Sequence, residues 1–308
     1  MTLEELAAAA PRAAPAPVPA WSWGCFHRRG VAFAGGQEDV ASRAVWIQAQ
    51  GLSGFLRVPA WRPEVAPRGR LHGCTVEELL ELSAVDGGVA DAAFSNGAMS
   101  WDNPSDFQPY ARWPDSAQMQ RVGPSLIQTG PGAAYAEDWR LQPGSSGLLV
   151  GLRLMFETGL DGLTRPRDGG LLIAGEHCLF SLDRRRPLPS DAAVQQQMRQ
   201  AGDPFAFADM AFDCETSYAR RRKDGSFKVE LSTNPFREGQ DVPVTDGFIQ
   251  TSISEVLRQS IGEGADKIVR QWRIDTLMAG MHVGLSTETD RAGAAWLKRE
   301  GKTLLRGL

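Results

Sequence analysis

The sequence lacks the short motifs that identify several common enzyme classes. It contains no Gly-x-Ser-x-Gly segment, no Gly-x-Gly-x-x-Gly segment and no Gly-x-x-x-x-Gly-Lys-Ser/Thr segment. These segments mark the nucleophile turn of many hydrolases, the dinucleotide-binding turn and the phosphate-binding loop. Their absence leaves hydrolase, Rossmann and P-loop NTPase functions without support.

Cysteine and histidine are also scarce, with four residues of each. Cys25, Cys74, Cys178 and Cys214 form no Cys-x-x-Cys pair, and the histidines form no His-Glu-x-x-His motif. We therefore expect buried, reduced thiols, no metal site and no cofactor. Reduced thiols are typical of a cytoplasmic protein. His282 leaves one alternative open, as an axial haem ligand or a proton carrier, although a lone histidine of this kind is more often structural.

The chain has little excess charge and no long apolar run. Its formal net charge is -4 over 308 residues, whereas a general nucleic-acid binder needs a basic face. The Ala/Pro-rich segment 1–20 carries Glu4 and Glu5 where a signal peptide has basic residues. We therefore expect neither nucleic acid nor a membrane as a partner. Hydrophobic residues make up 42% of the chain, enough for one large core or two smaller ones.

Strand patterns dominate the chain. Apolar, β-branched and aromatic residues at 44–48 and 55–58 predict a hairpin, with a turn at Gly51–Gly54. The apolar run 147–156 predicts another strand, and 171–174 with 177–180 predicts a second hairpin. Few segments favour a helix: Thr2–Ala10, Val76–Leu82, Asp191–Gln200 and Ala292–Arg299, with Ser254–Ile261 open between helix and strand.

Glycine and proline cluster between Glu157 and Gly170, which indicates a domain boundary. We expect a flexible lead at 1–20, a first β-barrel domain at 21–157 and a second at 168–308. Each piece has roughly the size of a single domain.

Residues 210–235 predict a hairpin that bends at Asp224-Gly225. A two-residue turn would pair Tyr218 with Leu231 and place the polar side chains together on one face. That face would carry Glu215, Ser217, Glu230, Ser232 and Asn234. Lining a barrel, its carboxylates could act as acids or bases and its other groups could orient a ligand, whereas a solvated outer face is the structural alternative.

Two further groups combine aromatic rings with polar side chains. Trp101, Asp106, Gln108, Asp138 and Trp139 form the first group, and Trp46, Gln48 and Arg57 form the second. Tryptophans can wall a pocket while carboxylates, amides and an arginine orient a ligand. We select Asp106, with Glu215 and Glu230, as candidate catalytic acids and the other residues of these groups as ligand-binding. The alternative is that the rings fill a core and the charges face solvent.

Several segments carry a resemblance to a known group of proteins. They are Trp46–Gln48, Leu56–Pro59, Trp101, Asp106–Pro109, Pro114-Asp115, Tyr135, Glu137, Trp139, Gly175–His177 and Glu230–Gly239. Together they resemble a group of uncharacterised bacterial proteins. That group is in turn similar to a fungal family of unknown function built as a pair of lipocalin-like (calycin) barrels.

The resemblance implies a mainly β fold of two consecutive antiparallel lipocalin-like barrels with a few short helices. It implies no established activity, and fold alone does not give function. Our first hypothesis is the binding of a small, partly apolar molecule in a barrel. The second is a cofactor-independent cyclase, isomerase or lyase of specialised metabolism that uses the same cavity. The third is a protein-interaction scaffold with filled barrels, and the sequence does not predict the oligomeric state.

Overall fold

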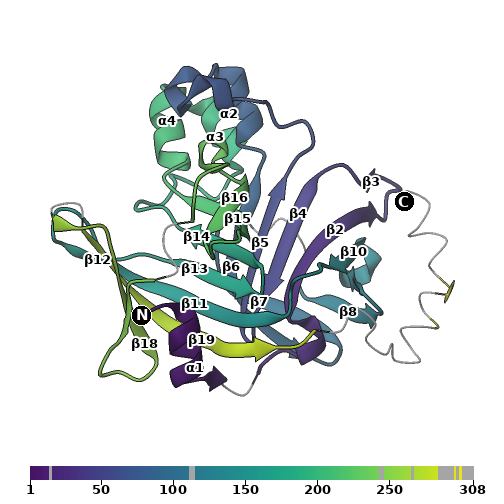
Figure 1. Cartoon of the computed structure of the whole chain (residues 1–308). Helices are drawn as coiled ribbons and strands as arrows, with labels where there is room; N and C mark the ends of the chain where they lie inside the picture. The colour runs from purple at the N-terminus through teal and green to yellow at the C-terminus, as the bar shows by residue number, and fades with distance from the viewer. Residues whose placement is uncertain are drawn as a thin grey trace.

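The computed structural model describes residues 1–13, 16–110, 115–242, 246–264 and 267–283, together with residues 295, 298 and 299. This part of the chain is mainly β and contains four short α-helices (Figure 1). The helices are α1 (Leu3–Ala9), α2 (Val76–Leu82), α3 (Val194–Gln200) and α4 (Pro204–Ala211). The predicted helix at 292–299 lies almost wholly outside the described residues.

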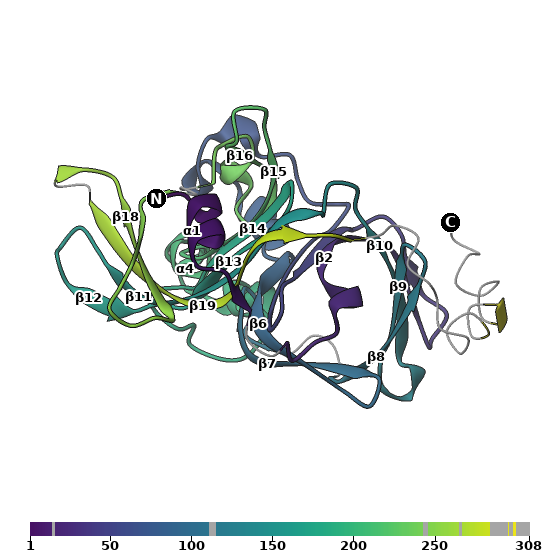
Figure 2. The same cartoon turned by 60° about the horizontal axis from the view of Figure 1, so that its bottom comes forward.

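Eight antiparallel strands of the first sheet close into a barrel. In spatial order they are β2 (Gly24–Phe33), β4 (Arg43–Gln48), β5 (Leu52–Val58), β6 (Asp86–Ser95), β7 (Ala98–Asp106), β8 (Ala117–Val122), β9 (Ser125–Thr129) and β10 (Tyr135–Leu141). β10 pairs back onto β2, from Tyr135 opposite Phe33 to Leu141 opposite Phe26. The short β3 (Glu38–Asp39) adds to β2 outside the ring. Figure 2 shows this ring nearly end-on.

The second sheet is open. Its main path is β16 (Phe227–Ser232), β15 (Glu215–Arg221), β14 (His177–Leu182), β13 (Gly169–Ala174), β11 (Gly147–Thr158), β19 (Ile268–Met281), β18 (Val256–Ile261) and β17 (Phe248–Gln250). β1 (Arg12–Ala13) pairs with β19, and β12 (Thr164–Pro166) pairs with β11. Among the described residues, no pairing joins the edge strands β16 and β17. One of the two predicted barrels is therefore confirmed, and the second is not.

The predicted boundary at 157–168 lies between the end of β11 and the start of β13. Strand β11, which was predicted to belong to the first domain, pairs within the second sheet. Strand pairing does not define folding units, and the predicted division into domains stays a prediction.

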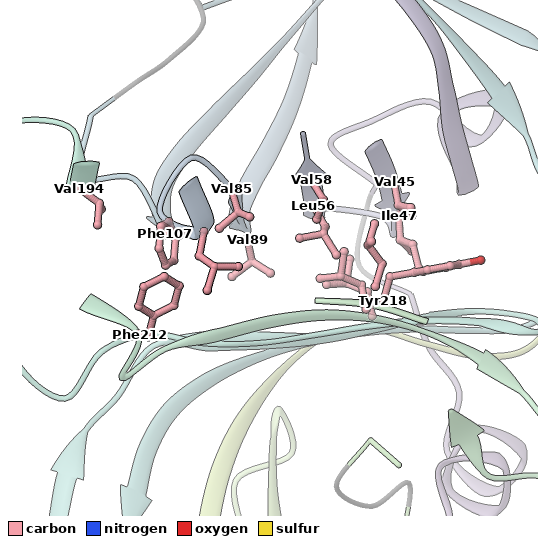
Figure 3. Close-up of a cluster of buried hydrophobic side chains, with 14 of the residues drawn as sticks. Val45, Ile47, Leu56, Val58, Val85, Val89, Phe107, Val194, Phe212 and Tyr218 are labelled. Carbon is pink, nitrogen blue, oxygen red and sulfur yellow. The ribbon is translucent and has the colours of Figure 1, made fainter. Parts of the chain in front are cut away.

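A continuous apolar layer joins the two sheets. Side chains on the outside of barrel strands β4, β5 and β6 pack against the second sheet and against helices α2, α3 and α4. Figure 3 shows Val45, Leu56 and Val89 facing the sheet that carries Tyr218. The opposite face of the second sheet is covered by α1 through Leu3 and Leu6. The central strands β11, β13 and β14 are thus buried on both faces over most of their length, which explains why they are apolar runs, whereas β16 alternates buried and exposed residues.

Residues 16–23 cross one end of the barrel. Trp21 packs edge-on against Phe94, with ring centroids 5.4 Å apart, and Phe94 N donates to Pro17 O. Val18 belongs to the apolar cluster inside the barrel, together with Phe26, Met99, Met119, Leu126 and Leu141. This end of the barrel is filled with side chains. No helix in the described ranges has the length and apolar character needed to cross a membrane.

Local sequence signals explain where most predicted elements begin and end. Thr2 and Thr75 each form a capping box, so α1 and α2 begin at the residues that follow them. The hairpins at 43–58 and 169–182 are confirmed. The first of them turns at 49–51 rather than at the predicted Gly51–Gly54, because Gln48 already pairs with Ser53. Residues 256–261 form a strand, which settles the open choice at Ser254–Ile261.

The hairpin of β15 and β16 differs from its prediction in its turn. Ser217 pairs with Ser232 and Tyr218 with Leu231, as predicted, but Ala219 then pairs with Val229. Arg222 N donates to Ser226 O across a three-residue loop in which Gly225 has a φ of 88°. The longer loop shifts the register by one residue, and the bulge at Tyr218/Ala219 restores it. The predicted two-residue turn is therefore wrong.

Candidate functional site

The barrel encloses a cavity of about 580 Å³ at the end opposite to residues 16–23. Its walls come from the inward-facing residues of the barrel strands, and segments 104–110 and 183–191 border its rim. Of the predicted site residues it is lined by Trp46, Arg57, Trp101, Asp106, Gln108 and Trp139. The two sequence segments that combine aromatic and polar residues therefore meet in one place.

Three tryptophans form the aromatic wall. The ring of Trp46 lies between the other two, with centroids 5.9 Å from Trp139 and 6.5 Å from Trp101, and both contacts are edge-on. Nε1 of Trp46 and Nε1 of Trp101 both donate to Ser53 Oγ, at 2.8 and 3.2 Å. Because the protein already satisfies these N–H groups, the indoles offer apolar area to the cavity.

A buried ion pair stands beside the aromatic wall. Arg28 Nη1 donates to Glu137 Oε1 at 2.8 Å, and Trp139 Nε1 donates to Glu137 Oε2 at 3.1 Å. Arg28 also pairs with Asp39 at 2.9 Å. Burial raises the pKa of Glu137, and the Arg28 guanidinium opposes that rise. The pair gives the cavity wall fixed charges of both signs, which is the arrangement that orients a polar ligand group.

Asp106 places a carboxyl group near the rim of the cavity. Its Oδ1 is buried and has no hydrogen-bond partner. Burial raises the pKa of Asp106 well above its usual range, and the nearby Asp86 carboxylate raises it further. A Cβ on Gly88 would lie 2.2 Å from Asp106 Oδ1, so only glycine at position 88 leaves room for this carboxyl. A carboxyl with a raised pKa keeps its proton to a higher pH than usual, and in that form it can donate a hydrogen bond or a proton.

Two predicted residues at the cavity have different surroundings. Gln108 Nε2 donates to Ser83 O and Val85 O, at 2.9 and 2.8 Å, and its Oε1 accepts from Val194 N at 3.2 Å. These three bonds engage its amide with backbone. Arg57 lines the cavity and donates to Ala84 O at 3.4 Å.

Other predicted site residues lie away from the cavity lining. Gln48 is fully buried and donates to Ala49 O and Leu52 O. Asp138 follows Glu137 on β10 and therefore points to the other side of the strand, where it contacts Arg140 at 3.4 Å. Asp138 is outside the cavity because a strand alternates its faces. Gln48 shares the face of Trp46, but it is the last residue of β4 and its amide bonds the backbone of the turn that follows.

The polar group predicted on β15 and β16 belongs to the second sheet and does not line the cavity. Ser217 Oγ donates to Glu215 Oε1 at 2.6 Å and lies 2.9 Å from Ser232 Oγ. Arg237 Nε donates to Glu215 Oε2 at 2.9 Å, and Asn234 Oδ1 accepts from Phe236 N.

Glu230 stands apart from this polar group, because it is exposed at the bulge. The other side chains of the group bond one another, Arg237 and nearby backbone, so the group holds the end of the hairpin in place. His282 is exposed directly after β19 and is also absent from the lining.

Four residues that line the cavity were not predicted as site residues: Arg28, Ser53, Tyr135 and Glu137. Tyr135, Glu137 and Trp139 alternate along β10, so the period of two was a visible signal that they share a face. Arg28 had no such signal, because its pairing with β10 spans more than a hundred residues. A separate group with metal-binding atoms, Cys25, His27 and His177, lies outside the cavity lining.

Comparisons with known proteins add one distant similarity. No family model matches the sequence, and no curated protein matches it. Among solved structures, the chain is similar to an uncharacterized protein from Saccharomyces cerevisiae, with 12% sequence identity and a TM-score of 0.43. The match covers 82% of this chain and 97% of that chain.

Proposed function

We propose that the protein binds a small, partly apolar molecule in the barrel cavity. The observation that carries this proposal is the wall of Trp46, Trp101 and Trp139 beside the buried pair of Arg28 and Glu137. Large apolar area with a few fixed polar groups is the usual composition of a small-molecule site. The volume of about 580 Å³ lies within the range of such sites.

In this proposal the indoles supply most of the contact area. The ion pair and the Gln128 and Tyr135 side chains, which also line the cavity, orient the polar part of the ligand. A protein-interaction scaffold with filled barrels has less support, because this barrel holds a cavity. The four unpaired cysteines support the proposed cytoplasmic location. Two further predictions remain proposals: that the barrel is lipocalin-like, and that the chain contains a second barrel.

The test is isothermal titration with any molecule that raises the melting temperature in a metabolite screen. Trp101→Ala removes one wall of the cavity, and we expect it to weaken binding by about 10-fold or more, the loss of a good aromatic contact. Trp61→Ala is the matched control, because Trp61 is 57% exposed and does not line the cavity. Equal affinities of the two variants would refute this site.

A second candidate function rests on Asp106. Its buried, unpartnered Oδ1 favours acid–base chemistry on the bound molecule, such as an isomerase, cyclase or lyase reaction. Asp106→Asn then abolishes turnover while binding persists, whereas Asp191→Asn, at the exposed rim of the same cavity, keeps turnover. Turnover by the Asp106→Asn variant at the wild-type rate would exclude this role.

A further inference from the structure

A second group of functional side chains lies between the barrel and the open sheet. Cys25 and His27 are alternate residues of β2, so both project from the outside of the barrel, away from the cavity that Arg28 lines. His177 approaches them from β14. One ligand atom from each side chain lies within 4.8 Å of the other two.

His177 is oriented as metal-binding histidines are. Its Nε2 lies 2.9 Å from Pro143 O, and because a carbonyl can only accept, Nε2 carries the proton. Nδ1 is therefore unprotonated, and its lone pair accepts a hydrogen bond from the Tyr218 hydroxyl at 2.8 Å. Ligating histidines characteristically donate their other ring N–H to a carbonyl or carboxylate, which fixes the tautomer and the ring.

The surroundings of His27 and Cys25 also fit a metal site. Nε2 of His27 is buried and has no hydrogen-bond partner. A buried polar atom without a partner is costly, so this nitrogen requires an explanation. Cys25 is fully buried, and its thiol is close to the Tyr218 hydroxyl. The ring of His27 meets the Tyr218 ring edge-on at 5.3 Å.

We propose that Cys25, His27 and His177 bind a Zn²⁺ ion. One thiolate and two imidazoles are donors that zinc accepts in proteins. Tetrahedral Zn–S and Zn–N bonds place ligand atoms roughly 3.4–3.6 Å apart. The three ligand atoms now lie within 4.8 Å of one another, so the distances between them have to shorten by up to about 1 Å. The Tyr218 hydroxyl now bonds His177 Nδ1, so it has to turn away before that nitrogen binds the ion.

Two arginines are the charged neighbours of this group. Arg220 and Arg43 lie near the imidazoles, but Arg220 is paired with Glu176 at 3.3 Å. The Cys25 thiolate offsets one of the two charges of the ion. The proposal is independent of ligand binding in the cavity, because the two sites are on opposite faces of β2.

The first experiment adds CoCl₂ to the full chain after treatment with a chelator. Cobalt substitutes for zinc and gives a thiolate-to-metal charge-transfer band when a cysteine is bound. We expect this band at one equivalent of cobalt and its loss on addition of ZnCl₂. A wild-type protein that gives no thiolate band would overturn the proposal.

Matched variants identify the ligands. We expect Cys25→Ser to remove the charge-transfer band, and His27→Ala to weaken zinc binding by at least about 10-fold in a titration. Cys214→Ser and His72→Ala are the controls, because both residues lie outside the group and His72 is exposed. Zinc affinity and cobalt spectra that are the same in all four variants would show that the ion binds elsewhere and would contradict the assignment.

Discussion

The pair of Arg28 and Glu137 provides a quantitative test of the cavity wall. The Arg28 side chain is 2% exposed and the Glu137 side chain 6% exposed, so neither charge is solvated in the folded protein. Replacing Glu137 by Leu leaves Arg28 with Asp39 alone and leaves Trp139 Nε1 without its acceptor. Breaking a buried pair from one side costs about 3–5 kcal/mol. Because Arg28 keeps Asp39 as a partner, the lower end of this range applies, and the lost acceptor adds about 1 kcal/mol, so we expect Glu137→Leu to lower the free energy of unfolding by about 4 kcal/mol.

The double variant Arg28→Met/Glu137→Leu separates this cost from loss of packing. It removes both charges, and Asp39 remains hydrogen-bonded to Ala41 N and Ser42 N and 24% exposed. We expect the double variant to be less stable than wild type by about 1–3 kcal/mol, mainly through the unsatisfied indole N–H. Equilibrium urea unfolding, followed by circular dichroism, measures both values. A double variant no more stable than Glu137→Leu would refute the reasoning.

Three further predictions concern the rim of the cavity. Gly88→Ala places a Cβ 2.2 Å from both Asp106 Oδ1 and Ser105 O, so the β7 backbone has to move with the carboxyl, and we expect the free energy of unfolding to fall by about 3 kcal/mol or more, whereas Gly202→Ala, in open space, stays within about 0.5 kcal/mol in the same urea assay. The raised pKa of Asp106 means that the unfolded state loses this proton near pH 4 while the folded state keeps it, so the stability of Asp106→Asn relative to wild type increases with pH from about 4 until the folded carboxyl ionises. A flat difference between pH 4 and 8 would contradict that pKa. Gln108→Leu leaves three backbone groups without partners, and we expect a loss of about 3 kcal/mol; a loss below about 1 kcal/mol would show that water replaces the amide.

Local sequence patterns predicted individual hairpins and helices better than they predicted the closure of the barrel. The hairpins at 43–58 and 169–182 and helices α1 and α2 carry their periodicity and caps in a few adjacent residues. Helix α4 was missed, although Asp203 caps it and Pro204 opens it; its last two residues, Met210 and Ala211, were assigned to the hairpin predicted at 210–235. The pairing of β10 with β2 closes the barrel over a long separation, and no local signal announces it.

The candidate site was predicted in part for the same reason. Trp46, Trp101 and Trp139 were selected as rings next to polar residues, and the barrel brings them together. The partner charges Arg28 and Glu137 come from strands that meet only when the barrel closes. The expectation of no metal site rested on the absence of a Cys-x-x-Cys pair and of a His-Glu-x-x-His motif. In a strand, Cys25 and His27 already share a face, and only the fold brings His177 to them.

The most direct test of the central claim is native mass spectrometry of the protein after incubation with a metabolite extract, compared with its mass after denaturation. Ala90 lines the cavity, so Ala90→Trp fills part of it, whereas Trp61→Ala leaves it unchanged. We predict a retained small molecule in wild type and in Trp61→Ala that is lost from Ala90→Trp. No retained mass in wild type, or the same retained mass in Ala90→Trp, would contradict ligand binding in the barrel.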